Sequence, residues 1–295
     1  MSFPLMPCPQ VLLESGLVWS AITPPTAGNM RYAAASDTGL FVVAGPSGAV
    51  YRSSDYGNTW ASATPSTGQM YGMAYGEGLF AITQDAGDNL YTSADGSTWT
   101  NRISASRDHH QVTYNDGYFV LGSGVAGGNG IIYGSADGTS WTQSPDTGSN
   151  SKQCGIYVSS LNRTFAGGLQ NAYFNGVPTA VSAWSGTPTG LTGTTYNVAW
   201  NGSIAVAVGT GGIFSSTALI AWTSRYSGAS MYGVAWCVDK FVAVGAGGMI
   251  QTSTDGITWT SRTSGTANDL YGVAEYNGVI LVTGNTGTVL RSSGS

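Results

Sequence analysis

Tryptophan recurs along this chain of 295 residues at a nearly constant spacing, and that spacing limits the possible folds more than any other feature. The repeated pattern runs serine, aspartate, glycine, a hydroxyl residue and then tryptophan. Its strong and weak copies end at Trp19, Trp60, Trp99, Trp141, Trp184, Trp222 and Trp259. Neighbouring members of this series lie 37 to 43 residues apart. A period of about 40 residues, repeated seven times, is typical of β-propeller blades.

The repeat that ends near Arg262 shows the strands of one unit most clearly. It predicts four strands, at Ser230–Trp236, Lys240–Gly245, Met249–Ser253 and Ile257–Arg262. Turn residues separate them, as short hairpins require. The second strand, "KFVAVG", is apolar on both faces, which suits a sheet packed between two others. We therefore predict an all-β fold, a closed seven-bladed β-propeller with four antiparallel strands per blade.

The two ends of the chain complement each other. The last repeat stops after a third strand at Thr288–Ser295, and the first begins with a fourth strand at Leu17–Thr23. We predict that the N-terminal strand completes the last blade, because this pairing closes the ring and leaves no open edge. The domain then spans 17–295, and residues 1–16 form an N-terminal extension.

An aspartate precedes the tryptophan by four or five residues in each strong copy. A tight hairpin leaves backbone N–H groups unpaired, and a short aspartate side chain can accept their hydrogen bonds. Glycine supplies a positive φ, and tryptophan covers the turn. We interpret four pairs as structural turn residues rather than catalytic ones: Asp55 with Trp60, Asp95 with Trp99, Asp137 with Trp141, and Asp255 with Trp259.

The stretch from Ser53 to Trp60, with its three shorter copies, resembles the Asp-box repeat of sialidase-type (BNR-like) propellers. With the degraded copies, the resemblance extends over most of the chain. It implies a hairpin between the third and fourth strands of a blade, at the rim and away from the central mouth. The motif is specific for that hairpin and unspecific for function.

Propeller ligands commonly bind at a mouth built by the loops that enter the first strands. The first strands here begin with aligned aromatic residues, which we take as the candidate ligand-binding set: Tyr32, Tyr71, His110, Tyr196, Tyr232 and Tyr271. Cys154 aligns with them in the remaining blade. Such a ring can stack on sugar faces while its hydroxyls form hydrogen bonds. The alternative is that these side chains pack between blades as repeating core residues.

Ionisable side chains are scarce at the predicted mouth. Asp108, His109 and His110 are adjacent, but neighbours on a strand point to opposite faces, so we expect neither a metal site nor a cofactor. We place Glu77 in a hairpin at the opposite end and Glu275 late in a first strand. A sialidase-like glycoside hydrolase needs converging ionisable groups, so we predict that the protein is not an enzyme.

Composition narrows the class of protein further. Charged residues make up 8% of the chain, the net charge is -5, and no Lys/Arg cluster could neutralise phosphates, which argues against nucleic-acid binding. No apolar stretch is long enough to insert in a membrane, and no basic segment precedes Arg31, so we expect no signal peptide.

Two resemblances then suggest a function. Gly-, Ser- and Thr-rich β-chains with few charges resemble bacteriophage tail and fibre proteins. This implies a virion protein, made in the host cytoplasm, that contacts a host-surface glycan or another virion protein. The stretch Leu270–Ser293 resembles photosystem II assembly propellers, which implies an assembly factor as the alternative.

Overall fold

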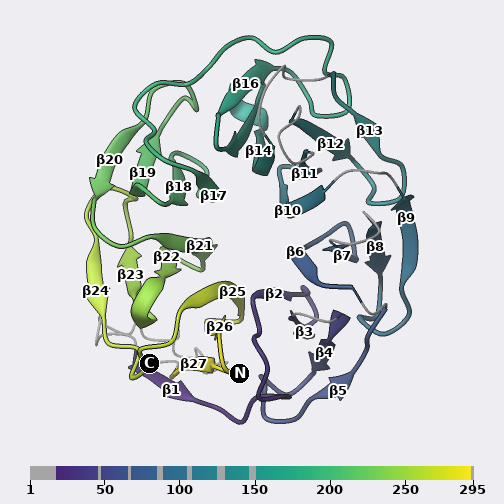
Figure 1. The fold of residues 1–295 in the computed structure, drawn as a ribbon, viewed down its shortest axis with the longest axis vertical. Coiled ribbons are helices and arrows are strands. Elements are labelled where there is room, and N and C mark those ends of the chain that lie inside the picture. The colour runs from purple at the N-terminus through teal and green to yellow at the C-terminus, as the bar shows by residue number, and fades with distance from the viewer. Residues whose placement is uncertain are drawn as a thin grey trace, which may run out of the picture.

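Seven small antiparallel sheets surround a central axis in the computed structural model, with each first strand innermost and each last strand outermost (Figure 1). The structure describes residues 18–45, 48–65, 68–84, 89–104, 108–124, 130–145 and 151–293, so the predicted extension at 1–16 lies outside it. The all-β, seven-bladed prediction is confirmed. In the described ranges the named helices are 3-10 turns, η2 (Ser159–Leu161) and η3 (Ala246–Gly248), and none could cross a membrane.

The first three blades each contain four strands. Blade 1 contains β2 (Tyr32–Ala35), β3 (Phe41–Ala44), β4 (Val50–Ser53) and β5 (Ala61–Ser62). Blade 2 contains β6 (Met70–Gly76), β7 (Leu79–Gln84), β8 (Asn89–Ser93) and β9 (Thr100–Ser104). Blade 3 contains β10 (Asp108–Asn115), β11 (Tyr118–Gly124), β12 (Ile131–Ser135) and β13 (Thr142–Gln143).

The remaining blades follow the same order with one exception. Blade 4 contains β14 (Lys152–Val158), β15 (Arg163–Gly168) and β16 (Ala172–Asn175). Blade 5 contains β17 (Thr195–Trp200), β18 (Ala205–Gly209), β19 (Gly212–Ser216) and β20 (Thr223–Tyr226). Blade 6 contains β21 (Met231–Cys237), β22 (Lys240–Gly245), β23 (Ile250–Ser253) and β24 (Thr260–Arg262). Blade 7 contains β25 (Leu270–Tyr276), β26 (Val279–Gly284), β27 (Val289–Ser293) and β1 (Val18–Ala21).

The ring closes through the N-terminal strand, as predicted. β1 pairs antiparallel with β27, and this register sets Trp19 opposite Ser292. The Trp19 side chain is buried with Ile280 and Leu290. The pairing gives blade 7 its fourth strand and satisfies an edge that would otherwise be exposed.

Blade 4 departs from the four-strand pattern. Its described residues form three named strands, and an isolated bridge between Tyr173 and Gly186 takes the place of the fourth. Trp184 still covers this edge, with its ring 5.5 Å from that of Phe174. The stretch leading to Trp184 contains Pro178, which has no N–H to donate to a ladder and so disfavours a regular strand.

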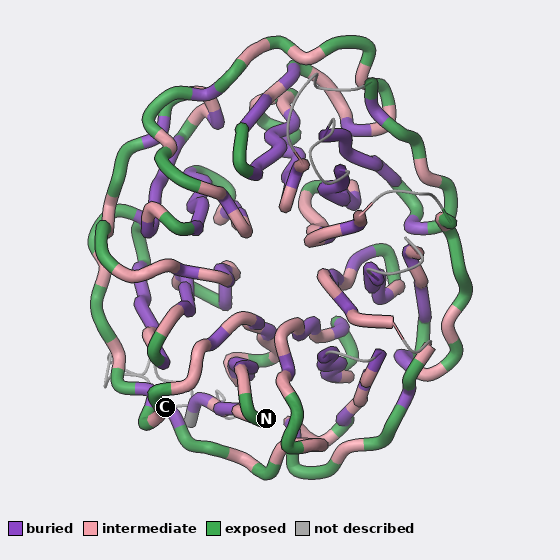
Figure 2. Tube along the Cα trace, in the orientation of Figure 1, coloured by how far each residue is buried: buried purple, intermediate pink, exposed green. Residues whose placement is uncertain are grey.

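The predicted strand bounds in blade 6 differ mainly near its turns. β22 matches the prediction, whereas β24 is shorter by three residues because Ile257 and Thr258 donate their backbone N–H groups to Asp255. The second strands are buried on both faces, and all residues of β3 and β18 are buried. Exposed residues gather on the outer strands and connections (Figure 2). The core thus lies between blades, and the inner strands frame the axis.

Candidate ligand-binding site

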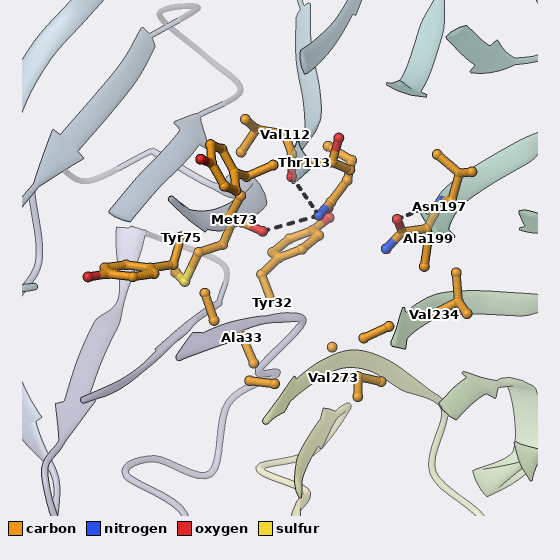
Figure 3. Close-up of a pocket in the computed structure, with 18 of the residues that line it drawn as sticks. Tyr32, Ala33, Met73, Tyr75, Val112, Thr113, Asn197, Ala199, Val234 and Val273 are labelled. Atoms are coloured by element: carbon orange, nitrogen blue, oxygen red, sulfur yellow. Dashed lines mark hydrogen bonds between the residues drawn. The ribbon is translucent and has the colours of Figure 1, made fainter. Parts of the chain in front are cut away.

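A cavity of about 650 Å³ lies on the axis of the ring, lined chiefly by residues of the first strands (Figure 3). The structure brings every member of the predicted ligand-binding set to this one cavity: Tyr32, Tyr71, His110, Tyr196, Tyr232 and Tyr271. The first strands converge because each is the innermost strand of its blade. A pocket of this size and mixed lining can enclose part of a small ligand.

Four side chains from consecutive blades form a continuous arc at the mouth, which we call the aromatic arc: Tyr196, Tyr232, Tyr271 and Arg31. The rings of Tyr196 and Tyr232 are 5.9 Å apart, and those of Tyr232 and Tyr271 are stacked at 4.7 Å. The Arg31 guanidinium carbon lies 5.1 Å from the centroid of the Tyr271 ring. Burial, and then the negative charge of Asp269, raise the pKa of Tyr232, so its hydroxyl remains a neutral donor.

The opposite part of the mouth combines Tyr71 with a polar group. The Tyr71 and His110 rings meet edge-on, with centroids 6.0 Å apart. His110 Nε2 lies 2.7 Å from Ser151 Oγ and 3.3 Å from Gln153 Nε2. A ligand here would meet hydroxyl, imidazole and amide groups, which can donate and accept hydrogen bonds.

Tyr32 reaches from blade 1 toward the axis (Figure 3), and its ring packs against the apolar cluster that contains Met73. Burial raises the pKa of Tyr32, against the opposing effect of the Arg31 charge. No hydrogen bond joins the Tyr32 hydroxyl to any residue that the structure describes. This hydroxyl is therefore available to a ligand.

The register of the sheets corrects the predicted alignment in blades 1 and 4. β2 pairs Ala35 with Phe41, just as β6 pairs Tyr75 with Phe80, and counting back four residues makes Arg31, not Tyr32, the counterpart of Tyr71. In blade 4 the irregularity in pairing lies between Lys152 and Cys154, where other blades carry the tyrosine, so Gln153 occupies that place. Cys154 is instead fully buried in the core.

Below the mouth the cavity wall becomes apolar. Ala33, Met73, Val112, Val234 and Val273 surround this part of the axis (Figure 3). Such a wall favours apolar groups, or the apolar face of a ligand, because each buried CH₂ contributes about 0.8 kcal/mol.

The deep end of the cavity has hydroxyls that the protein itself uses. Tyr75 donates to Asp37 at 2.7 Å, and Tyr114 donates to Glu77. Glu77 lies in the hairpin between β6 and β7, as predicted. Glu275 lines the cavity and accepts from the Gly278 N–H at 2.6 Å. These hydrogen bonds occupy the two glutamates of the described residues.

His109 and His110 point to different surroundings, as strand alternation predicts. His109 is buried, with Nδ1 3.1 Å from Ser123 Oγ and its ring edge-on to Tyr133. Within the described ranges, no group of three or more His, Cys, Asp or Glu side chains is arranged to hold a metal ion.

The four aspartates of the repeated turns lie between third and fourth strands and form the predicted hydrogen bonds. Asp255 Oδ1 accepts from the backbone N–H groups of Ile257 and Thr258 at 2.8 and 2.7 Å. Burial alone would raise the pKa of Asp255, but these hydrogen bonds outweigh it and lower the pKa to about 2. In blade 1, hydrogen bonds from Thr59 lower the pKa of Asp55 to about 2. The corresponding hydrogen bonds lower the pKa values of Asp95 and Asp137 as well.

Sequence reasoning missed Arg31 and Gln153. A signal was present for Arg31, because in three blades the residue before the tyrosine of the mouth is a large, buried apolar side chain. Met70, Met231 and Leu270 precede Tyr71, Tyr232 and Tyr271, and Met30 precedes Arg31 in the same way. In blade 4, the polar Lys152 takes the place of that apolar residue. The register of the first strand of this blade therefore could not be recognised from the sequence.

Comparisons with known proteins agree with this architecture. Residues 13–111 match the model of the DUF6242 beta propeller domain family. No curated protein matches the chain in sequence.

Among solved structures, "YCF48 bound to D1 peptide" aligns at TM-score 0.70 and 16% identity, over 94% of this chain and 95% of that one. YCF48 from Cyanidioschyzon merolae aligns at TM-score 0.68 and 16% identity, over 93% of this chain and 98% of that one. The WD40 beta propeller domain of Doa1 aligns at TM-score 0.76 and 14% identity, over 95% of this chain and 97% of that one. At these identities the similarity concerns the fold.

Proposed function

We propose that this protein is a non-enzymatic binding protein that holds a glycan in the mouth of its axial cavity. The observation that carries the proposal is the convergence of the six predicted residues on one cavity, with three tyrosines in contact. Their rings offer apolar faces to sugar C–H groups, and their hydroxyls can bond sugar hydroxyls. With the fibre-like composition, this supports a role as a receptor-binding or structural part of a bacteriophage virion, outside the host cell.

The residues around the cavity favour binding over catalysis. Catalysis by paired carboxylates requires two acids flanking one bond. Glu77 accepts a hydrogen bond from Tyr114 at the deep end, and Glu275 accepts one from a backbone N–H. Neither glutamate belongs to the aromatic arc, which itself contains no carboxylate.

A glycan array tests the proposal directly. The purified protein should bind a subset of glycans, and Tyr232→Ala and Tyr71→Ala should each weaken that binding about tenfold, since stacking and hydrogen bonding are lost together. Asp255→Ala, at a turn on the rim, serves as the control and should leave binding unchanged. Binding that survives both tyrosine changes and fails in Asp255→Ala would place the ligand on the rim instead.

A second candidate is binding of an extended peptide by an assembly factor. It is favoured by the fold shared with "YCF48 bound to D1 peptide" over nearly the whole chain, together with the apolar wall below the mouth, which can receive an apolar side chain. A peptide array run beside the glycan array separates the two candidates. Peptide binding that depends on Tyr232, with no glycan bound, would favour the assembly factor.

A further inference from the structure

Arg31 differs from the other arginines of the described residues in what its guanidinium contacts. The other six each donate a hydrogen bond to a protein oxygen, and they are Arg52, Arg102, Arg163, Arg225, Arg262 and Arg291. The Arg31 guanidinium donates no hydrogen bond to a described residue, and its Nε is buried without a partner. The backbone N–H of Arg31, by contrast, donates to the carbonyl of Ala44. The ion pair among the described residues joins Lys240 to Asp239, in the hairpin between β21 and β22, at the end of β21 opposite to Tyr232. Arg31 therefore has donors to offer.

The position of Arg31 directs these donors to the candidate site. Its side chain lies over the Tyr271 ring, which fixes the guanidinium by a cation–π contact and ends the aromatic arc. Its charge also acts on Tyr32, the next residue, which lines the cavity. The guanidinium thus lies against the ring of one cavity tyrosine, Tyr271, and its charge acts on a second, Tyr32.

A buried N–H without an acceptor carries a desolvation cost that a bound acceptor would remove. The planar guanidinium matches a carboxylate in a two-bond fork, a geometry that a point charge such as lysine does not provide. We propose that Arg31 binds the carboxylate of an acidic sugar, a hexuronic acid residue, at the mouth of the cavity. This inference rests on the proposed glycan function and names the class of glycan.

The other charge at the arc agrees with this placement. Asp269 accepts from the Gly247 N–H at 2.8 Å, and its second oxygen lies 3.5 Å from the Tyr271 hydroxyl. It forms no ion pair with Arg31. Its negative charge disfavours an anion on the blade 6 side of Tyr271, so a carboxylate is directed to the Arg31 side, beside Tyr32.

The test compares one oligosaccharide in two forms. Oligogalacturonates, alginate fragments and glucuronate-containing oligosaccharides are each titrated with their carboxyl-reduced counterparts, which keep every linkage and lose the charge. The wild-type protein should bind the acidic form of at least one pair about tenfold more tightly, as expected for one charge-assisted fork. Arg31→Gln should remove that preference, and Arg31→Lys should restore part of it.

Arg262→Gln is the matched control, because it removes an arginine at the rim that donates to Thr252. It should keep the preference for the acidic form. The measured quantity is the ratio of the affinities for the acidic and the carboxyl-reduced oligosaccharide. A variant that only disturbs the packing of the aromatic arc would weaken both affinities alike and leave this ratio unchanged. Thermal melting confirms that each variant is folded.

The outcomes separate the inference from the function on which it rests. Equal binding of both forms, or a preference that persists in Arg31→Gln, overturns the carboxylate site while a Tyr232-dependent glycan site stands. If no acidic or neutral saccharide binds, both proposals are wrong.

Discussion

Blades 5 and 6 build the same turn between their third and fourth strands from different residues. In blade 6 the turn reads Ser253-Thr254-Asp255-Gly256, and in blade 5 it reads Ser216-Thr217-Ala218-Leu219. The first serine acts alike in both, since its Oγ accepts from Gly256 N–H at 2.8 Å and from Leu219 N–H at 2.9 Å. The aspartate is therefore one of two acceptors in the turn, and the serine is the one that both blades keep.

In blade 5 the aspartate is absent, and a buried leucine, Leu219, stabilises the turn instead. Leu219 adopts a positive φ of 60°, close to the 69° of Gly256, although leucine rarely takes that conformation. Its side chain is fully buried with Trp222, whereas a Cβ on Gly256 would come 3.1 Å from Ile204. Both turns keep the serine hydrogen bond; blade 6 adds hydrogen bonds to a carboxylate, and blade 5 adds apolar packing. The two turns should therefore respond differently to mutation and to pH.

The largest expected effect comes from removing the Leu219 side chain. Leu219→Ala should lower the free energy of unfolding by about 2–5 kcal/mol, because it deletes buried methyl groups and leaves a cavity. Urea denaturation measures the loss. Leu219→Gly should cost no more than Leu219→Ala, because glycine also relieves the left-handed backbone. A much larger loss in Leu219→Gly would show that backbone strain is not part of this turn.

The matching change in blade 6 tests conformation without core burial. Gly256→Ala should cost about 1–2 kcal/mol, because alanine disfavours φ of 69° and its Cβ would come close to Ile204 and Phe241. Gly278→Ala, at φ of 79° in open space, separates the two causes and should cost less. Equal losses would assign the whole effect to the backbone.

Asp255→Ala should cost about 1 kcal/mol, by analogy with helix caps and other hydrogen-bonding side chains. Because the pKa of Asp255 is depressed to about 2, its contribution is present above its unfolded pKa near 4 and disappears as pH falls toward 2. The stability gap between wild type and variant, measured by denaturation from pH 7 to pH 2, should shrink over that interval. A gap that is constant with pH would contradict the charge-based account of this turn.

The smallest effect is a gain. Ala218→Asp puts a carboxylate where blade 6 has Asp255, within a turn whose serine contacts are already formed. It should stabilise the protein by about 0.5 kcal/mol at pH 7, with the benefit lost at pH 2. Thermal melting at the two pH values measures it. A destabilised variant would mean that the blade 5 turn does not present its N–H groups as blade 6 does.

The same contrast explains how far the sequence predicts the fold. Strong copies of the repeat carry enough turn chemistry to locate blades, hairpins and ring closure. Blade 4 loses its regular fourth strand around Pro178, and the register of its first strand is masked by Lys152, a polar residue at a buried position. A repeated sequence pattern predicts the packing that recurs from blade to blade. It does not predict a structural feature that occurs in a single blade.

The candidate site was predictable to the extent that it repeats. The tyrosines were located because several blades share them, and the structure places them on one cavity. Arg31 occurs once, and its importance depends on its distance to Tyr271 and on the absence of a described acceptor, both of which are properties of three-dimensional arrangement.

Pairing of β1 with β27 has a consequence for biosynthesis. The side chain of Ser20 donates to the carbonyl of Arg291, 271 residues further along the chain. During translation, Val18–Ala21 leave the ribosome before every other strand that the structure describes, and their partner strand leaves after all of these. Blades 1 to 6 can form from neighbouring residues as they emerge, but blade 7 must wait for the longest loop closure in the molecule, which is slow. Until β1 pairs with β27, the free edge of β27 and the apolar side chain of Trp19 can contact other nascent chains. The joining of these two strands is therefore the folding step most exposed to misassembly.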